Sequence, residues 1–250
     1  MGAKSYFISD LHLGAPYISD PRAHEARIVS WLEAIAPDAA RLYMLGDVMD
    51  YWYEYRTVAP RGHVRFLGAL ARLADSGCEI VWLKGNHDIW IFDYLPREIG
   101  LRVVDGTFTC ELDGKRFLLE HGDGVGEIDR GYALMRRVFR NRFCQLLYGA
   151  IHPRWTIAFA HGWSGKSRKS APVATPALIE RDMARLRSFA ENTNASEPGR
   201  PFDYFVFGHL HLPSLTEIAA GGAKMVVLGD AYRSFSYGEW DGTTFRLKKF

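Results

Sequence analysis

Five short motifs rich in aspartate and histidine are spread along this chain, and each follows directly on a short apolar run that is typical of a β-strand. The motifs are Asp10-Leu11-His12, Gly46-Asp47, Gly85-Asn86-His87-Asp88, His121-Gly122-Asp123 and Gly208-His209-Leu210-His211. The runs before them are Tyr6–Ser9, Leu42–Leu45, Val81–Lys84, Phe117–Glu120 and Tyr204–Phe207. Because the carboxyl ends of strands in open α/β sheets face one crevice, the pattern predicts five loops that bring these side chains together.

Segments with helical spacing alternate with the first of these strands. Arg22–Ile35 and Gly62–Asp75 separate the strand-like runs Ser5–Ile8, Arg41–Leu45 and Glu79–Leu83. This β-α-β-α-β order predicts a parallel sheet covered by helices. The later elements expected are the strands Leu101–Val104, Thr107–Leu112, Lys115–Glu120, Tyr204–Phe207, Leu215–Ala219, Lys224–Leu228, Ser234–Trp240 and Phe245–Lys248, and the helix Thr175–Ala190 followed by a polar loop, Glu191–Pro201. The sequence therefore predicts an α/β fold with two sheets packed face to face, helices outside and one helical insertion.

The segment from Arg130 to Ile179 carries nine Lys or Arg residues and no Asp or Glu, although the whole chain has a formal net charge of only +2. This asymmetry suggests an anionic partner, and charge alone leaves nucleic acid, anionic lipid and a phosphorylated substrate open. Bulky apolar side chains are interleaved with the arginines: Phe139, Phe143, Leu146, Leu147, Tyr148, Trp155 and Phe159. Such a segment could bind a charged head with acyl chains, touch an anionic membrane, or pack its aromatics on the main domain with its arginines in solvent. The aromatic clusters at 51–55 and 90–95 could likewise line an acyl-chain cleft or pack between loop and cap.

The candidate ligands combine carboxylate, amide and imidazole, and they are Asp10, His12, Asp47, Asn86, His121, His209 and His211. Such a mixture suits Mn²⁺, Fe²⁺ or Zn²⁺. It lacks the thiolates of structural zinc sites and holds too many imidazoles for a calcium or magnesium cage. Seven ligands exceed the need of one ion and suit two ions that share a carboxylate. A pair of ions is the arrangement that promotes in-line displacement at phosphorus.

The cysteines and the N-terminal residues favour a reducing compartment. Cys78, Cys110 and Cys144 are odd in number and far apart, which argues against a disulfide framework. The first residues include a charge at Lys4 and lack the apolar core of a signal peptide. No apolar run approaches the ~20 residues of a membrane-spanning helix. We expect a cytoplasmic protein and leave open a peripheral contact with the cytoplasmic face of the membrane.

In this order, D-x-H, G-D, G-N-H-D, H-G-D and G-H-x-H resemble the motifs of the calcineurin-like metallophosphoesterase superfamily. The resemblance covers almost the whole chain and implies a four-layer α/β/β/α sandwich with a helical cap. Residues 1–125 and 175–250 would form the phosphoesterase domain, and residues 126–174 would form the cap. The ligands that it implies are Asp10, His12 and His211 for a first ion, Asn86, His121 and His209 for a second, and Asp47 as the bridge.

The same resemblance implies roles for the two residues that follow Asn86. His87 would lie near the leaving-group oxygen as an electrostatic stabiliser or general acid, and Asp88 would orient or tune it. The alternative to a catalytic role is that His87 caps a helix or supports the metal ligands without contacting the metal ions.

A narrower resemblance is to the UDP-2,3-diacylglucosamine diphosphatases of lipid A synthesis, which release UMP and a diacylated sugar 1-phosphate. It rests on Asp10–Gly14, Gly46–Trp52, His121–Asp123 with Asp129–Tyr132, and Leu228–Asp230. It implies a nucleotide-sugar-lipid substrate, two divalent ions with Mn²⁺ first, and contacts from Asp129, Tyr132, Lys166, Ser167 and Lys169. The best-known members have arginine where this chain has His87, which also leaves a sister branch with G-N-H-D-x-W open.

Three other functions are compatible with the same motifs. A nuclease or phosphodiesterase would use the basic segment to bind nucleic acid, although the bulky aliphatic residues there exceed what base stacking needs. A non-catalytic protein-binding scaffold would be expected to lose ligands, and this chain retains all seven. A general phosphomonoesterase would gain nothing from acyl chains. The oligomeric state does not follow from the sequence.

Overall fold

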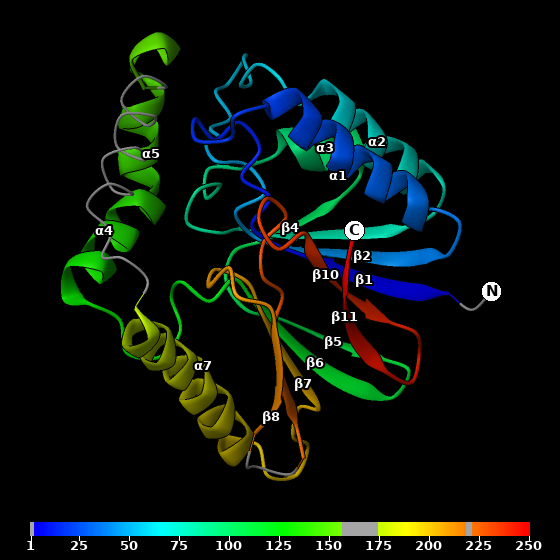
Figure 1. The fold of residues 1–250 in the computed structure, drawn as a ribbon. Helices are drawn as coiled ribbons and strands as arrows, with labels where there is room; N and C mark the ends of the chain where they lie inside the picture. The colour runs from blue at the N-terminus through cyan, green and yellow to red at the C-terminus, as the bar shows by residue number, and fades with distance from the viewer. Residues whose placement is uncertain (1–2, 157–174, 219–221) are drawn as a thin grey trace.

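Two β-sheets lie face to face at the centre of the molecule (Figure 1). The computed structural model describes residues 3–156, 175–218 and 222–250. The first sheet has the order β11-β10-β1-β2-β3-β4, and the second has the order β5-β6-β7-β9-β8. The strands of the first sheet are β1 (Lys4–Ile8), β2 (Ala39–Leu45), β3 (Glu79–Leu83), β4 (Arg102–Val104), β10 (Ser236–Trp240) and β11 (Phe245–Lys249). Those of the second are β5 (Phe108–Leu112), β6 (Lys115–Glu120), β7 (Tyr204–Phe207), β8 (Ser214–Glu217) and β9 (Lys224–Val227).

Within each sheet, the strands that precede the five motifs pair in parallel with one another, as the alternation of elements predicts. β1, β2, β3 and β4 pair in parallel in the first sheet, and β6, β7 and β9 pair in parallel in the second. The hairpin strands β10, β11, β5 and β8 pair in antiparallel fashion at the flanks. The carboxyl ends of the parallel strands therefore open toward one edge of each sheet.

Helices cover the outer face of each sheet (Figure 1). They are α1 (Pro21–Ile35), α2 (Val64–Asp75) and α3 (Tyr94–Ile99) on the first sheet, and α7 (Pro176–Ser196) on the second. Alternation along β1 shows how the layers form: Tyr6 and Ile8 join the cluster beneath α1 and α2, whereas Phe7 points into the cluster between the sheets. A third cluster lies between α7 and the second sheet. The four-layer α/β/β/α sandwich is confirmed.

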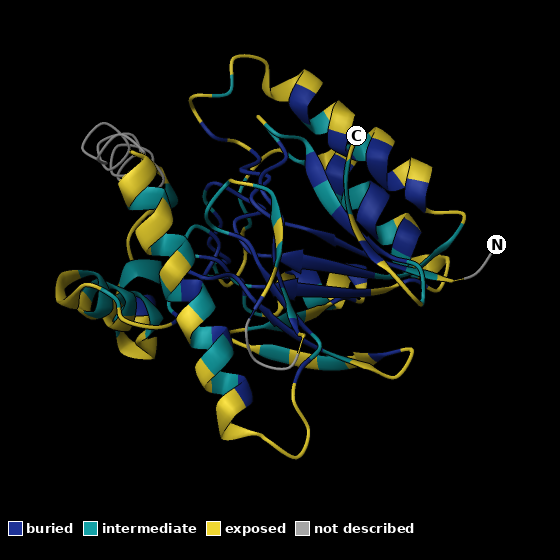
Figure 2. Ribbon diagram, turned by 60° about the horizontal axis from the view of Figure 1, so that its bottom comes forward, coloured by how far each residue is buried: buried dark blue, intermediate teal, exposed yellow. Residues whose placement is uncertain are grey.

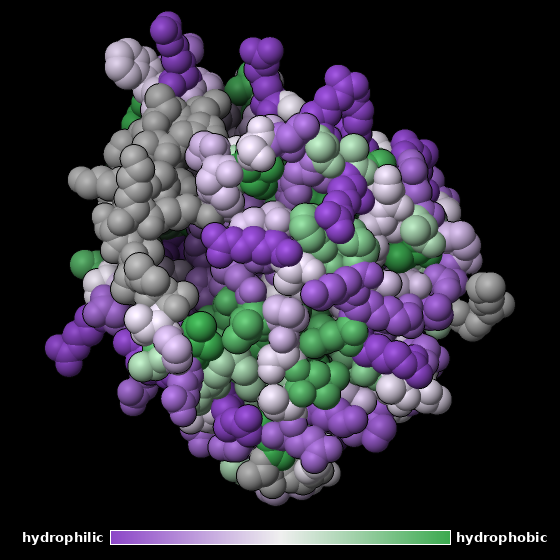
Figure 3. Space-filling model, viewed as in Figure 1, coloured by the Kyte–Doolittle hydropathy of each residue, from purple (hydrophilic) through white to green (hydrophobic). Residues whose placement is uncertain are grey.

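The solvent-facing sides of these helices are polar. Figure 2 shows α1 and α7 with one buried and one exposed face each, and the helices over the first sheet present mostly hydrophilic residues in the upper right of Figure 3. No helix within the described ranges is both long and apolar enough to cross a bilayer.

Two helices of the acid-free segment stand beside the sandwich (Figure 1). They are α4 (Arg130–Arg140) and α5 (Arg142–Gly149), and Asn141 ends the first and begins the second, since its side chain accepts from the N–H groups of Phe143 and Cys144. Leu134, Phe143, Leu146 and Trp155 in this region are more than half exposed. We refer to residues 126–156 as the cap helices.

The largest differences from the sequence prediction are at α7 and α3, whereas several other elements begin or end one or two residues from their predicted bounds. Helix α7 continues to Ser196, through residues predicted as a polar loop, because the buried Asn194 side chain donates to the carbonyl of Phe202 and accepts from its N–H. These two bonds hold the polar last turn of the helix against the sheet. The short helix α3, which lies where only an aromatic cluster was noted, begins where the buried Glu54 carboxylate accepts from the N–H groups of residues 92–95.

Candidate metal centre

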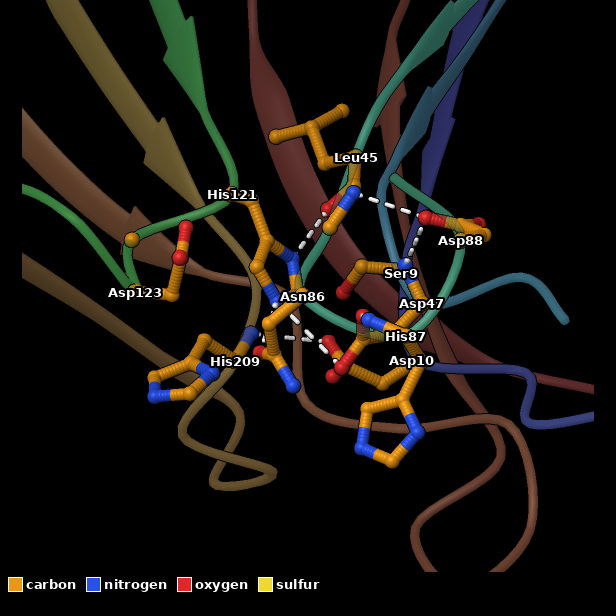
Figure 4. A network of polar contacts seen from close by, with 12 residues as sticks. Ser9, Asp10, Leu45, Asp47, Asn86, His87, Asp88, His121, Asp123 and His209 are labelled. Carbon is orange, nitrogen blue, oxygen red and sulfur yellow. Dashed lines mark hydrogen bonds and ion pairs between the residues drawn. The ribbon is translucent and has the colours of Figure 1, made fainter. Parts of the chain in front are cut away.

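The loops after β1, β2, β3, β6 and β7 meet at one place, as Figure 4 shows. Backbone hydrogen bonds link neighbouring loops: the N–H of Asp10 donates to the carbonyl of Gly46, and that of His12 to the carbonyl of Asp47. Within the second sheet, the N–H of Gly208 donates to the carbonyl of His121, and across the two sheets the N–H of His209 donates to Oδ2 of Asp10. The predicted convergence of the five motifs is therefore present in the fold.

The backbone at this site is held in an uncommon conformation. Positive φ angles of 47° to 68° occur at five non-glycine residues: Asp10, His12, Asp47, His209 and His211. A positive φ costs an L-residue free energy, and such residues cluster where side chains must be aimed at a ligand or reacting group. Five of the seven candidate ligands thus share a strained geometry that regular secondary structure does not require.

The first group of candidate ligands contains Asp10, His12 and His211, whose ligand atoms lie within 4.8 Å of one another. The Nε2 atoms of both histidines are 3.8 Å from Oδ1 of Asp10. Oδ2 of Asp10 accepts from the N–H of His209, whereas the buried Oδ1 accepts no hydrogen bond from the residues that the structure describes. A buried carboxylate oxygen facing two imidazoles in this way fits a cation.

The second group contains Asp47, His121 and His209, with Asn86 beside them. Nδ1 of His121 donates to the carbonyl of Leu45 over 2.7 Å, so Nε2 is the ring nitrogen that can take up a second proton or bind a metal ion. That nitrogen faces two oxygen acceptors, Oδ2 of Asp47 at 3.4 Å and Oδ1 of Asn86 at 3.2 Å. Either a second proton or a metal ion must lie between them, because a bare lone pair and two oxygens repel one another. Asp47 also lies between the two groups, with Oδ2 3.9 Å from Nε2 of His12.

Glycines allow the loops of Asp47 and Asn86 to approach. A Cβ atom at Gly85 would lie 2.1 Å from Oδ1 of Asp47, and one at Gly46 would lie 2.6 Å from Nδ1 of His121. Both contacts are closer than atoms can pack, so only glycine fits at these two positions. The glycines beside the ligands therefore set the spacing of the centre.

Burial and mutual charge set the protonation of the site. Burial lowers the pKa of His12, lowers that of His209 to about 4 and lowers that of His211 to about 2. These imidazoles are therefore neutral, which is the form that binds a metal ion. Burial opposes ionisation of Asp47, but the neighbouring His121 and His87 hold its pKa well below its ordinary value. Burial raises the pKa of Asp10 to about 7, and a bound cation would stabilise its charged form.

The two residues after Asn86 contact different partners from those expected. Nδ1 of His87 donates to the backbone carbonyl of Asp50 over 2.9 Å, which leaves Nε2 as the ring nitrogen for another partner. The His87 ring faces the carboxylate of Asp50, whose Oδ1 lies 3.6 Å from Nδ1, and the backbone N–H of His87 donates to Oδ1 of Asp47 over 2.9 Å. Asp88 is fully buried and accepts from backbone N–H groups of both loops and from the indole of Trp82. The predicted contact of Asp88 with His87 is corrected: Asp88 ties the loop of Asp47 to that of Asn86.

Asp50 is the residue that the motif analysis passed over. Its buried Oδ1 accepts from Nδ1 of His12 over 3.2 Å, which directs Nε2 of His12 toward Asp10 and Asp47. One carboxylate thus orients a candidate ligand and lies beside His87. The feature of the sequence that could have indicated Asp50 is its position three residues after Asp47, in the same loop.

The cap helices are attached to the site through Asp123 of the H-G-D motif. The Asp123 carboxylate accepts from the hydroxyl of Tyr132 over 3.0 Å and from Nε of Arg136 over 3.1 Å. Asp129, a predicted substrate contact, accepts from the N–H groups of residues 131 and 132 and so caps the start of α4. The other predicted contacts, Lys166, Ser167 and Lys169, lie outside the described residues.

Aromatic residues of the loops after β2 and β3 pack against the cap helices at a second place. The ring of Trp90 lies 4.7 Å from that of Tyr148, and its indole N–H donates to the carbonyl of Phe139. The hydroxyls of Tyr51 and Tyr148 are 3.2 Å apart, and Tyr53 donates to the carbonyl of Gln145. The clusters pack between loop and cap, and Tyr53, Tyr55 and Phe92 also line a cavity of about 750 Å³ with Leu146 of α5, so acyl-chain binding there stays a prediction.

A cavity of about 1130 Å³ extends from the metal centre between the start of α4 and α7. Asp123 and His209 lie at its inner end, and Asp129, Tyr132 and Arg185 line its wall. This volume exceeds the range of about 300–1,000 Å³ typical of small-ligand pockets. The described part of the chain therefore leaves room for a large ligand next to the candidate ligands of the second group.

Residues 3–213 match the calcineurin-like phosphoesterase family, and the chain belongs to that family. A UDP-2,3-diacylglucosamine hydrolase of Porphyromonas gingivalis is 44% identical over 260 residues, covering 99% of this chain and 98% of that protein. One of Stenotrophomonas maltophilia strain R551-3 is 30% identical and covers 92% of each. Among solved structures, an archaeal phosphodiesterase covers 99% of both chains at 12% identity and a TM-score of 0.49.

Both resemblances drawn from the motifs are thereby confirmed, and the chain is a metal-dependent hydrolase. The residue types fit divalent cations, because neutral imidazoles, an amide and carboxylates converge and a buried oxygen of Asp10 faces two histidines.

Proposed function

We propose that this protein hydrolyses the pyrophosphate of UDP-2,3-diacylglucosamine to UMP and 2,3-diacylglucosamine 1-phosphate, a step of lipid A synthesis. The observation that carries the proposal is the 44% identity to a UDP-2,3-diacylglucosamine hydrolase over nearly the full length of both chains. The clustered ligands and the cap beside them support it, because the reaction needs both a phosphorus-activating centre and a surface for a lipid.

The division of the ligands follows the two groups within the site. Asp10, His12 and His211 would hold one ion, and Asn86, His121 and His209 would hold the other, with Asp47 shared between them. Two divalent cations bound there would supply a nucleophile at neutral pH and neutralise charge on the transferring phosphoryl group. Mn²⁺ is the proposed ion, with Fe²⁺ and Zn²⁺ as alternatives, because mixed imidazole and carboxylate ligands suit all three.

His87 would act on the leaving-group side. Its Nδ1 is held by the carbonyl of Asp50, so Nε2 is free to point at the departing phosphate oxygen. Part exposure of the ring, 21% of the side chain, lets substrate reach it. We assign it electrostatic stabilisation or proton donation to that oxygen, and we assign Asp50 and Asp88 to positioning.

The cap helices would receive the diacylated sugar. We propose residues 126–174 as a substrate-binding cap on a phosphoesterase domain formed by residues 1–125 and 175–250. Tyr132 lines the cavity beside Asp123, and Asp129 lies at its rim, which supports the proposed sugar or nucleotide contacts. Lys166, Ser167 and Lys169 remain proposed phosphate and sugar contacts on the strength of their position in the sequence alone.

The exposed face of the cap would also bring the enzyme to its lipid substrate. Leu134, Leu146 and Leu147 are more than half exposed beside the arginines of α4 and α5. Apolar side chains next to cations favour an anionic membrane surface. We therefore propose a cytoplasmic protein in peripheral contact with the cytoplasmic membrane face.

The test is turnover of UDP-2,3-diacylglucosamine by purified protein with added Mn²⁺, followed as UMP release. Single-stranded DNA and a small phosphomonoester serve as competing substrates, and the Asp47→Ala variant serves as the inactive control. The proposal requires kcat/KM for UMP release from the lipid substrate to exceed kcat/KM on each of the other two substrates by at least about 1000-fold. Discrimination of this size is what several well-placed polar contacts to the correct substrate provide. Equal turnover of all three would refute the substrate assignment.

A further inference from the structure

Two tyrosines and an arginine form one rim of the metal centre. Tyr17 lies beyond the loop of Asp10 and His12, and Tyr232 and Arg233 lie just after Asp230 in the loop that follows β9. The rings of Tyr17 and Tyr232 are 5.5 Å apart at an interplanar angle of 64°. Cζ of Arg233 lies 5.4 Å from the ring centre of Tyr232. We call these three residues the tyrosine rim.

The rim borders the first group of candidate ligands. The ring of Tyr232 lies 5.7 Å from that of His12 and 5.6 Å from that of His211, nearly perpendicular to both. Tyr17 lies 6.3 Å from the ring of His12. The cap helices are attached beside the other group, through the Asp123 carboxylate, which accepts from Tyr132 and Arg136. The rim and the attachment of the cap therefore flank opposite groups of the centre.

These two flanks differ in chemistry. Among the described residues, the most exposed leucines of the cap helices are Leu134, Leu146 and Leu147, at 56% to 73%, whereas Leu212 beside His211 is 42% exposed. The rim adds an aromatic residue, Tyr17, that is 37% exposed, and a cation, Arg233, over the neighbouring ring of Tyr232. Aliphatic surface suits acyl chains, whereas an aromatic face suits the planar ring of a nucleobase, whose stacking adds affinity without base-specific hydrogen bonds.

We propose that the tyrosine rim is the nucleobase subsite: the base of the nucleotide half stacks on Tyr17, while Tyr232 holds that ring beside the metal centre and Arg233 adds a cation to the same surface. The proposal rests on the proposed function in one respect, that the substrate carries a nucleotide. It assigns the two unlike ends of the substrate to two unlike sides of the centre.

Binding of UMP and of ribose 5-phosphate to the Mn²⁺-loaded full-length protein tests the subsite, because the two ligands differ in the base alone. Calorimetry should give UMP an affinity about 5- to 150-fold higher than that of ribose 5-phosphate, the range that one base stack contributes. Tyr17→Ala should remove most of this preference with little change in the affinity for ribose 5-phosphate. Tyr17→Phe retains the aromatic face and should retain the preference.

Tyr94→Ala on α3 is the matched control, because Tyr94 is 40% exposed and lies outside the rim, and it should keep the preference for UMP. The rim also has a structural alternative, in which its rings only support His12 and His211. In that case Tyr17→Ala would weaken UMP and ribose 5-phosphate alike and lower the affinity for Mn²⁺, and this result would overturn the subsite.

Kinetics separate the subsite from the proposed function. Tyr17→Ala should raise KM for UDP-diacylglucosamine, and its loss of kcat/KM on that substrate should exceed its loss on bis-p-nitrophenyl phosphate by at least about fivefold. Absence of turnover on the lipid substrate together with a base preference would end the proposed function and leave the subsite in place. Turnover without any preference of the wild-type protein for UMP over ribose 5-phosphate would end the subsite alone.

Discussion

Replacement of Asp50 by asparagine tests how the site orients its ligands. Oδ1 of Asp50 accepts from Nδ1 of His12 over 3.2 Å, and the side chain is 1% exposed. A hydrogen bond to a charged acceptor contributes ~1.5–3 kcal/mol and a neutral one ~0.5–1.5 kcal/mol, so the asparagine, which can still accept, should cost about 1–2 kcal/mol. Since about 1.4 kcal/mol corresponds to a factor of ten, Mn²⁺ affinity should fall about 5- to 30-fold. Asp50→Ala removes the hydrogen-bond acceptor and should weaken Mn²⁺ binding about 10- to 100-fold.

The assay is calorimetric titration of the metal-free variants with Mn²⁺, with circular dichroism to show that each is folded. Asp93→Asn is the matched control, because Asp93 is 61% exposed and its ion pair is with Arg97 on the surface of α3. Wild-type affinity in both Asp50 variants would refute the argument that this carboxylate fixes His12 for metal binding.

Three further results are expected. Gly85→Ala should lower turnover about 100-fold or more, because its Cβ would displace the Asp47 carboxylate 2.1 Å away, and steady-state assays with a check of folding would show this. Asp123→Asn should weaken the attachment of Tyr132 and Arg136, so limited proteolysis should cut the cap helices several-fold faster, whereas unchanged cleavage would argue against that attachment. Mn²⁺ at 100 times its Kd should stabilise the fold by about 2.7 kcal/mol per site, seen as a rise in Tm that EDTA reverses.

The motifs and the strands before them could be predicted because each depends on local chemistry. The predicted bounds of β3 and β6 are those that the structure has, since each strand contains a short apolar run that is buried: Ile80–Leu83 in β3 and Phe117–Leu119 in β6. The convergence of the five loops followed from one general property of parallel sheets. The family's motif order then implied the sandwich, which the three hydrophobic clusters confirm.

The supporting contacts could not be predicted, because they join residues far apart in the chain. Asp88 was expected to act on its neighbour His87, but the backbone turns its carboxylate toward loop N–H groups 40 residues earlier. Asp123 belongs to the H-G-D motif and Asp50 lies three residues after Asp47, but their partners Tyr132 and His12 follow only from the fold. The polar end of α7 was predicted as a loop because it is held by a tertiary contact, the hydrogen bond from the Asn194 side chain to the carbonyl of Phe202.

The most direct test of the central claim is the number of Mn²⁺ ions bound per chain, measured by elemental analysis after loading and removal of excess metal. We expect two ions in the wild-type protein and fewer than two in Asp47→Ala, because Asp47 lies between the two groups of ligands. The Asp47→Ala variant should also lose the release of UMP from UDP-diacylglucosamine. Zero or one ion in the wild-type protein, or two firmly held ions in the variant, would contradict a shared two-ion centre.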